Sequence, residues 1–191
     1  MKTNNFTELK ERILASARSA KACREQYGRA YSSETQEELI EVIKHNFHWC
    51  VANKVLTVSL IEEYRDLFTE HGIHCNESVD SGYLLADNAT VRACGSATVE
   101  ACGSATVRAC GSATVRACGS ATVRACDSAT VRACGSATVR ACDSATVEAC
   151  DSAYITSYDI IECQLSDKAI YRIRGTNTIR FASDDLKFEQ V

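Results

Sequence analysis

The sequence ATVRACGSATVEACGS, residues 89–104, opens a run of eight consecutive octapeptides that continues without a gap to Ser152. Each copy follows the pattern Ala-Thr-Val-Arg/Glu-Ala-Cys-Gly/Asp-Ser. A short repeat of this kind is typical of a solenoid, in which every unit buries its apolar face only against its neighbours. The repeat therefore predicts the architecture of the C-terminal half of the chain.

Apolar and polar residues alternate within each octapeptide, which we number 1 to 8 from Ala89 to Ser96. The alternation predicts a short β-strand with positions 1, 3 and 5 (Ala, Val, Ala) inward and positions 2 and 4 (Thr, Arg or Glu) outward. Position 7 holds only Gly or Asp, which tolerate turn conformations, so it predicts a corner. The chain is thus expected to form a coiled ribbon of strands and corners.

The length of one coil follows from the thickness of its core. Eight residues at ~3.3 Å each give a perimeter of only ~26 Å, which is too short to close a coil. Two octapeptides, about 16 residues, predict a flattened two-sided solenoid whose thin interior suits Val and Ala. A triangular coil of three octapeptides, about 24 residues, is the alternative, and its wider interior would be poorly filled.

The same register extends into diverged sequence on both sides. Downstream, position 3 is Ile155, Cys163, Tyr171 and Ile179, and position 5 is Ser157, Leu165, Ile173 and Phe181. Upstream, the residues at positions 3, 5 and 7 are Tyr83, Leu85 and Asp87. This register predicts about 13 octapeptides from Ser81 to Asp184, with larger inward residues sealing both ends.

The first 72 residues contain no octapeptide and carry a helical pattern. Apolar spacing and capping residues predict three helices, which begin near Asn5, after Ser33 and at Ser59, the last ending at Gly72. We therefore predict an α+β chain: a three-helix capping domain over residues 1–72 and a two-sided parallel β-solenoid with a C-terminal cap over residues 73–191. The helical domain is expected to dock on the open end of the solenoid.

Composition and charge restrict the setting. The 191 residues carry a net charge of −4, so the chain is neither a polycation nor an acidic tail. The start, MKTNNFTELK, has no hydrophobic leader, and no run of about 18 apolar residues occurs. These features predict a cytoplasmic protein that does not enter a membrane.

Eight of the twelve cysteines occupy position 6 of the repeat. With two octapeptides per coil they form two ladders: Cys94, Cys110, Cys126 and Cys142 along one edge, and Cys102, Cys118, Cys134 and Cys150 along the other. A cytoplasmic setting predicts free thiols that pack at the corners, and a metal-thiolate ladder or a redox role is the alternative. Neighbours about 4.8 Å apart are nevertheless close enough for disulfide pairing.

The sequence contains none of the common catalytic motifs, such as a phosphate-binding loop or a nucleophile elbow. All four histidines lie in His45-x2-His48-x-Cys50 and His71-x2-His74-Cys75. These spacings match no familiar zinc finger, and polar surface and core packing explain them more simply. We predict that the protein is not an enzyme and has no metal site and no cofactor.

The outward positions offer the candidate binding residues. One face carries Thr90, Thr106, Thr122 and Thr138 beside Arg92, Arg108, Arg124 and Arg140. The other face is mixed, because its position 4 reads Glu100, Arg116, Arg132 and Glu148. Regular surfaces of this kind predict a structural or protein-interaction module that binds an acidic partner or a second copy of itself.

Two alternatives use the same rows. The arginines could follow the phosphates of a nucleic acid, although the charge is near neutral and no aromatics are interleaved. The Thr rows resemble those of ice-binding solenoids, but those have Thr-x-Thr where this chain has Thr-x-Arg. Duplication by slippage explains identical rows without any function.

The octapeptides, with Trp49-Cys50-Val51-Ala52-Asn53 and Ala153-Tyr154-Ile155-Thr156-Ser157-Tyr158, resemble bacterial octapeptide-repeat proteins associated with prophages and other mobile elements. The resemblance covers most of the chain. It implies a repeat fold and is compatible with a host-directed binder or inhibitor, but it implies no residue roles.

Overall fold

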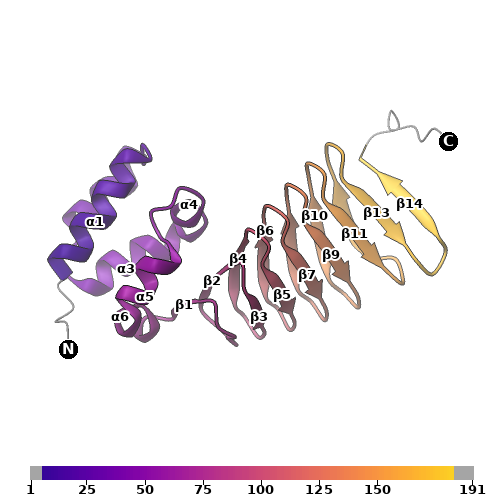
Figure 1. Cartoon of the computed structure of the whole chain (residues 1–191), viewed down its shortest axis with the longest axis horizontal. Coiled ribbons are helices and arrows are strands. Elements are labelled where there is room, and N and C mark those ends of the chain that lie inside the picture. Colours follow the sequence, from indigo (N-terminus) through magenta and orange to yellow (C-terminus); the bar gives the residue numbers. More distant parts are fainter. Residues whose placement is uncertain (1–5, 183–191) are drawn as a thin grey trace. The chain divides into compact units, whose positions relative to one another are not determined.

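A computed structural model describes residues 6–182 of the chain (Figure 1). Two compact units divide the chain, Met1–Cys75 and Asn76–Val191. The first unit is helical and the second is built of β-strands. The mixed α+β class predicted from the sequence is therefore confirmed.

The helical unit contains six short helices where the sequence predicts three. They are α1 (Phe6–Ser19), α2 (Arg24–Ser32), α3 (Gln36–His45), α4 (Phe47–Ala52), α5 (Val58–Glu63) and α6 (Arg65–Glu70). Each predicted helix is interrupted once. The interruptions lie at residues 20–23, at Asn46 and at Tyr64, and the predicted start near Asn5 lies outside the described residues.

Local backbone and side-chain chemistry explains these interruptions. Lys21 has a φ of 56°, which an α-helix cannot contain. At the end of α3 the side-chain amide of Asn46 donates to the Val42 carbonyl at 2.8 Å and so ends the ladder. Two N-caps also differ from the prediction, which placed them at Ser33 and Ser59. The Thr35 hydroxyl accepts a hydrogen bond from the amide three residues later in the chain, and so does the Thr57 hydroxyl.

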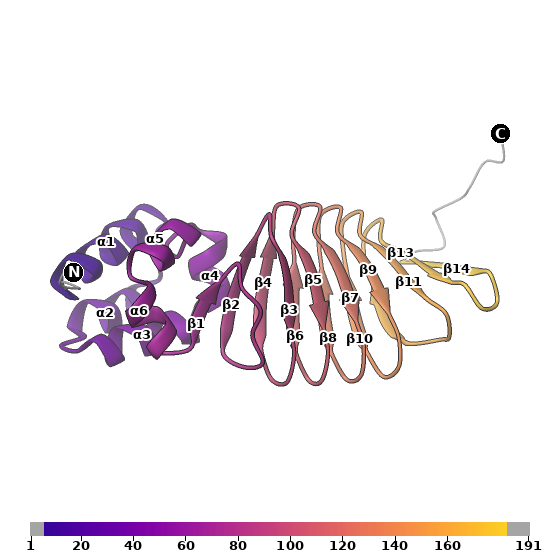
Figure 2. The same ribbon diagram turned by 60° about the horizontal axis from the view of Figure 1, so that its bottom comes forward.

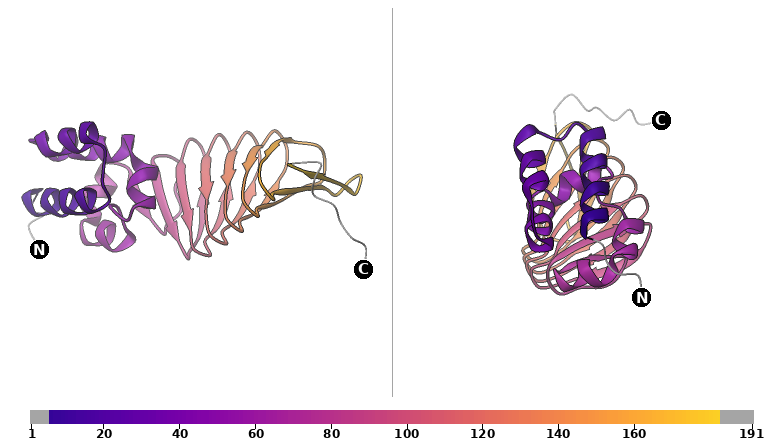
Figure 3. Two further views of the ribbon diagram at one scale, coloured as in Figure 1. Left: turned by 90° about the horizontal axis from the view of Figure 1, so that it is seen from above. Right: turned by 90° about the vertical axis from the view of Figure 1, so that its left-hand side faces the viewer.

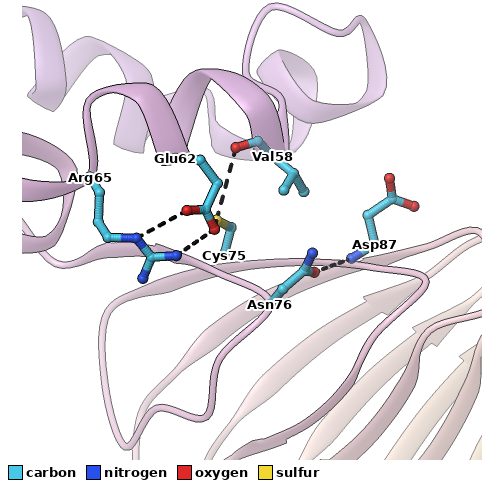
Figure 4. Close-up of polar contacts among 6 residues, drawn as sticks. All are labelled: Val58, Glu62, Arg65, Cys75, Asn76 and Asp87. Carbon is cyan, nitrogen blue, oxygen red and sulfur yellow. Dashed lines mark hydrogen bonds and ion pairs between the residues drawn. The ribbon is translucent and has the colours of Figure 1, made fainter.

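The core of the helical unit is closed by the short strand β1 (Ile73–Cys75), which packs against α5 and α6. Leu9, Leu39 and Phe68 are among its fully buried side chains. Figure 4 shows the Cys75 thiol directed at the Glu62 carboxylate, at 3.3 Å, while Arg65 Nε donates to the other oxygen of Glu62 at 3.1 Å. These contacts fasten β1 to α5.

The β-unit is a parallel solenoid made of two sheets (Figure 2). One sheet has the order β2 (Tyr83–Asp87), β4 (Thr98–Cys102), β6 (Thr114–Ala117), β8 (Thr130–Ala133), β10 (Thr146–Ala149) and β12 (Glu162–Leu165). The other has the order β3 (Thr90–Ala93), β5 (Thr106–Ala109), β7 (Thr122–Ala125), β9 (Thr138–Ala141), β11 (Tyr154–Ser157), β13 (Ile170–Ile173) and β14 (Thr178–Phe181). We call them the even sheet and the odd sheet.

The pairing register confirms two octapeptides per coil. Thr106 pairs with Thr122 and Thr130 pairs with Thr146, so each residue meets its equivalent two octapeptides away. Consecutive octapeptides therefore lie in opposite sheets. At the corner between β3 and β4, Cys94 stacks on Cys110 with their Cα atoms 4.6 Å apart. The triangular coil is excluded.

Positions 1, 3 and 5 fill the interior as the alternation predicts. Val107, Val115, Val123, Val131 and Val139 are completely buried, and the Ala residues at positions 1 and 5 beside them are at most 2% exposed. Because Ala and Val are small, they suit a thin interior between two closely spaced sheets. A coil has no core of its own and is stable only between its neighbours.

The first octapeptide of the register was predicted one residue out of place. Leu84 pairs with Val99 and Ala86 with Ala101, so these two residues, and not Tyr83 and Leu85, take the inward positions. The corner is also shifted by one residue. It was predicted at Asp87, but the residue with a left-handed backbone is Asn88, whose φ is 52°. The Asn88 side chain accepts from the Ser104 amide at 2.9 Å and fixes this shorter first coil.

The last octapeptide does not continue the coil either (Figure 3). β14 pairs antiparallel with β13, with Ile170 opposite Phe181. Ile179, predicted to face inward, is 45% exposed as a result. The hairpin turns at Asn177, whose φ is 53°. The predicted end at Asp184 lies outside the described residues.

Candidate functional site

The eight predicted binding residues lie together on the odd sheet. Arg92, Arg108, Arg124 and Arg140, which we call the Arg ladder, occupy equivalent places in β3, β5, β7 and β9. Thr90, Thr106, Thr122 and Thr138 form a parallel row two residues earlier. All eight residues are exposed. The arrangement presents four guanidinium groups at a spacing of one coil.

The Arg ladder has no acidic neighbour along its row. Within residues 6–182 none of its four guanidinium groups forms an ion pair. On the even sheet, by contrast, Arg132 Nε donates to Glu148 at 2.8 Å across adjacent strands. Glu100, expected on that exposed face, is buried and lies opposite Leu85 in the register. The two faces therefore differ in charge as well as in sequence.

Both cysteine ladders form along the edges of the solenoid. One pair differs from the predicted free thiols, because Cys94 and Cys110 are joined by a disulfide. The equivalent Cys134 and Cys150 are unbonded, with their sulfur atoms 2.8 Å apart. Parallel stacking in register explains the contact, since it places the same atom of successive coils at nearly the same point.

Two further clusters add a carboxylate to a cysteine pair. The ligand atoms of Cys126, Cys142 and Asp143 lie within 4.8 Å of one another, and so do those of Cys134, Cys150 and Asp151. Packing at the corners was predicted for these cysteines, with a metal-thiolate ladder as the alternative, and Asp at position 7 was predicted only as a turn residue. That the side chains at positions 6 and 7 both meet the neighbouring coil was missed. The signal was the dipeptide Cys-Asp, repeated one coil after a cysteine.

The environment suppresses the ionisation of these thiols. Burial raises the pKa of Cys102 to about 11. The pKa of Cys142 is raised first by burial and then by hydrogen bonds with Cys126 and Asp143, while for Cys150 the hydrogen bond with Cys134 is the leading cause. At neutral pH these groups are thiols and therefore weak nucleophiles.

The histidines are not drawn into a metal-binding cluster within the described residues. His45 Nδ1 lies 2.8 Å from the carbonyl oxygen of Glu41 in its own helix. The helical unit also has an apolar hollow, lined by residues that include Ile13, Leu39 and Ile43. Its polar contact is an amide pair, in which Asn46 donates to Gln26 at 3.1 Å. Two thiols, Cys23 and Cys50, also line the hollow, and burial raises the pKa of Cys50 to about 12, so Cys50 is a thiol at neutral pH.

Comparisons with known proteins add no assignment. A scan against models of protein families finds no match to the chain, and searches of curated proteins and of solved structures find no significant match. Among the described residues, no helix is both long and apolar enough to cross a membrane. The resemblance to bacterial octapeptide-repeat proteins stays an expectation drawn from the sequence.

Proposed function

We propose that the protein is a non-enzymatic interaction module of the cytoplasm whose odd sheet binds an acidic surface of another protein. The observation that carries the proposal is the Arg ladder: four exposed arginines in register, with no ion pair in the described part of the chain. A mobile-element setting would make the partner a host protein.

Electrostatics favours an acidic partner. Guanidinium groups about 5 Å apart in water repel one another by ~0.8 kcal/mol per adjacent pair, and salt reduces this cost. Carboxylates placed between them would turn the repulsion into attraction, and arginine binds carboxylates with two parallel hydrogen bonds. A second copy of the same face would set arginines against arginines. The ladder therefore favours a different protein over self-association through this sheet.

The backbone of the odd sheet supports such binding by holding the side chains in fixed places. Thr106 N–H donates to the Ala89 carbonyl at 2.8 Å, and Cys110 N–H donates to the Ala93 carbonyl at 3.0 Å. These two hydrogen bonds join β5 to β3 before and after Arg108 in the chain. A partner then meets a surface that loses little backbone entropy on binding.

The test compares three immobilised proteins for capture from the native cell. They are the wild type, a ladder variant with Arg92, Arg108, Arg124 and Arg140 changed to Ser, and a control with Arg116→Ser and Arg132→Ser on the even sheet. We expect the wild type and the control to retain the same acidic protein and the ladder variant to lose it. Retention should fall as salt is raised, because the contact is ionic.

The proposal fails if the wild type and the ladder variant retain the same proteins, or if neither retains any. Nuclease treatment separates the alternative of nucleic-acid binding. If the captured material is nucleic acid and its retention falls steeply with salt, the Arg ladder follows phosphates instead.

A further inference from the structure

The two clusters of thiols and carboxylate form a repeated site of their own, separate from the Arg ladder. In the first, the Cys142 thiol lies 3.2 Å from Asp143 Oδ2, and Cys126 of the coil before completes the group. In the second, Cys150 lies 2.8 Å from Cys134 and 3.9 Å from Asp151 Oδ2. One cluster follows strands of the odd sheet and the other follows strands of the even sheet.

The carboxylates are held in place by the backbone of the preceding coil. Asp151 Oδ2 accepts from the Gly135 amide at 2.8 Å, and Asp143 Oδ2 accepts from the Asp127 amide at 3.3 Å. Groups that fix a metal ligand in this way raise metal affinity, because they remove the cost of orienting it. The carboxylate therefore stays beside the paired sulfurs.

The donor set suits a borderline-soft divalent cation. Zn²⁺ takes thiolates at about 2.3 Å and carboxylate oxygens at about 2.0–2.2 Å in a tetrahedron, often with water as the fourth ligand. Tetrahedral bonds of these lengths place the ligand atoms about 3.3–3.8 Å apart. The clusters lie within 4.8 Å, and small rotations of Cys134 and Cys150 would open their short contact.

Exposure gives an ion a route to both clusters. Cys142 and Asp143 are exposed, and Cys150 borders a surface depression that Arg132, Glu148 and Gln164 also line. An ion can therefore reach the sulfur atoms without opening the fold.

We propose that Cys126, Cys142 and Asp143, and likewise Cys134, Cys150 and Asp151, bind Zn²⁺ and link consecutive coils of the solenoid. Binding of one ion releases the two thiol protons to solvent and leaves each sulfur as a thiolate ligand. No oxidant takes part. In each site Cys-Asp follows a free cysteine one coil earlier. Cys126-Asp127 also follows Cys110, but the sulfur of Cys110 is held in the disulfide with Cys94. Cys102 and Cys118 are followed by Gly103 and Gly119 and form no such site.

The direct test titrates the full-length, metal-free protein with Zn²⁺ by calorimetry and with Co²⁺ by absorption, with the Cys94–Cys110 disulfide intact and the other cysteines as free thiols. We expect about two ions per chain and a sulfur-to-cobalt charge-transfer band. Affinity should rise with pH, since the thiols must lose protons. Uptake of no ion, or a cobalt spectrum without thiolate ligation, would overturn the proposal.

Matched variants locate the sites. We expect Asp143→Ala with Asp151→Ala to weaken binding by about tenfold or more, and Cys142→Ser with Cys150→Ser to abolish the cobalt band. Cys102→Ser with Cys118→Ser is the control, because it removes stacked thiols that lack a carboxylate. Equal loss in the control would contradict the assignment.

A gain of binding avoids the question of folding. Gly119→Asp places a carboxylate after Cys118 and one coil beyond Cys102, so the proposal predicts a third ion. A β-carbon at Gly119 would lie 3.0 Å from the Gly103 oxygen, as close as at Gly135. A correctly folded Gly119→Asp protein, judged by circular dichroism, that still binds two ions would contradict the rule.

Discussion

Each corner of the solenoid from Asn88 to Asp151 contains one residue with a left-handed backbone. Asp127 has a φ of 57° and Asp143 a φ of 58°, although this conformation costs a residue with a β-carbon about 1–2 kcal/mol. The aspartates offset this cost with a hydrogen bond to the coil before, since Asp127 Oδ2 accepts from the Gly111 amide at 2.9 Å. Asp is therefore suited to a corner only where the preceding coil leaves room for its β-carbon.

This difference predicts that the same substitution has effects of different size at two glycines. A β-carbon at Gly95 would lie 2.3 Å from the Asp80 oxygen, whereas at Gly135 its closest neighbour is the Gly119 oxygen at 3.0 Å. We expect Gly95→Asp to lower the free energy of unfolding by at least about 2 kcal/mol through overpacking. Gly135→Asp should change it by less than about 1 kcal/mol, because the new carboxylate can bind the Gly119 amide.

Urea unfolding of the two variants beside the wild type measures both effects. Equal destabilisation by the two substitutions would show that the corners are interchangeable and that the account of Asp at position 7 is wrong.

At the scale of the strand, the last coil carries one large side chain with a polar group, that of Tyr171, in the core position that the repeats fill with Val. Tyr171 of β13 occupies the place of a repeat valine and is 1% exposed. Its hydroxyl lies 2.6 Å from Ser157 Oγ and accepts from the Ile161 amide at 3.0 Å. The wider ring fills the end of the core, and its hydroxyl satisfies a buried amide that the loop after β11 leaves without a strand partner.

Removal of that hydroxyl should destabilise the end of the solenoid. We expect Tyr171→Phe to lower the free energy of unfolding by about 1–3 kcal/mol, because the Ile161 amide is left buried and unbonded. Tyr158→Phe is the control: Tyr158 is 64% exposed, and its change should stay within about 0.5 kcal/mol. Chemical denaturation compares the two, and similar values would refute the role of the Tyr171 hydroxyl.

Prediction from the sequence succeeded where many copies agreed and failed where one residue decided. The inward Val and Ala, the two-octapeptide coil and the position of the Arg ladder follow from periodicity, which eight copies specify redundantly. The break between α3 and α4 at Asn46 depends on a single side chain that donates a hydrogen bond to its own helix. The register shift at Leu84 arises because the first coil is one residue shorter than the others. The Cys-Asp clusters could be predicted only by placing the Cys and Asp side chains of one coil beside the Cys side chain of the coil before it.

At the scale of the whole solenoid, two octapeptides per coil decide which charges lie side by side. With this coil the odd sheet collects Arg92, Arg108, Arg124 and Arg140 in one row. A coil of three octapeptides would stack Glu100, Arg124 and Glu148 in one row and would break up the ladder. The proposed binding face and the proposed zinc sites therefore both depend on the same register.

Disulfide formation in proteins with only two cysteines measures that register directly. Three variants keep Cys110 together with Cys118, with Cys126 or with Cys134, and carry Ser at every other cysteine. Serine already occupies position 6 at Ser166, where it donates to the Ala149 carbonyl at 3.3 Å, so the fold should accept it. Each dilute variant is treated with a mild oxidant, and intact mass reports the loss of two hydrogen atoms.

We expect rapid closure only for Cys110 with Cys126, which lie one coil apart in the ladder that brings Cys94 and Cys110 within 4.6 Å. Faster closure of Cys110 with Cys118 or with Cys134 would contradict the two-octapeptide coil and, with it, the Arg ladder.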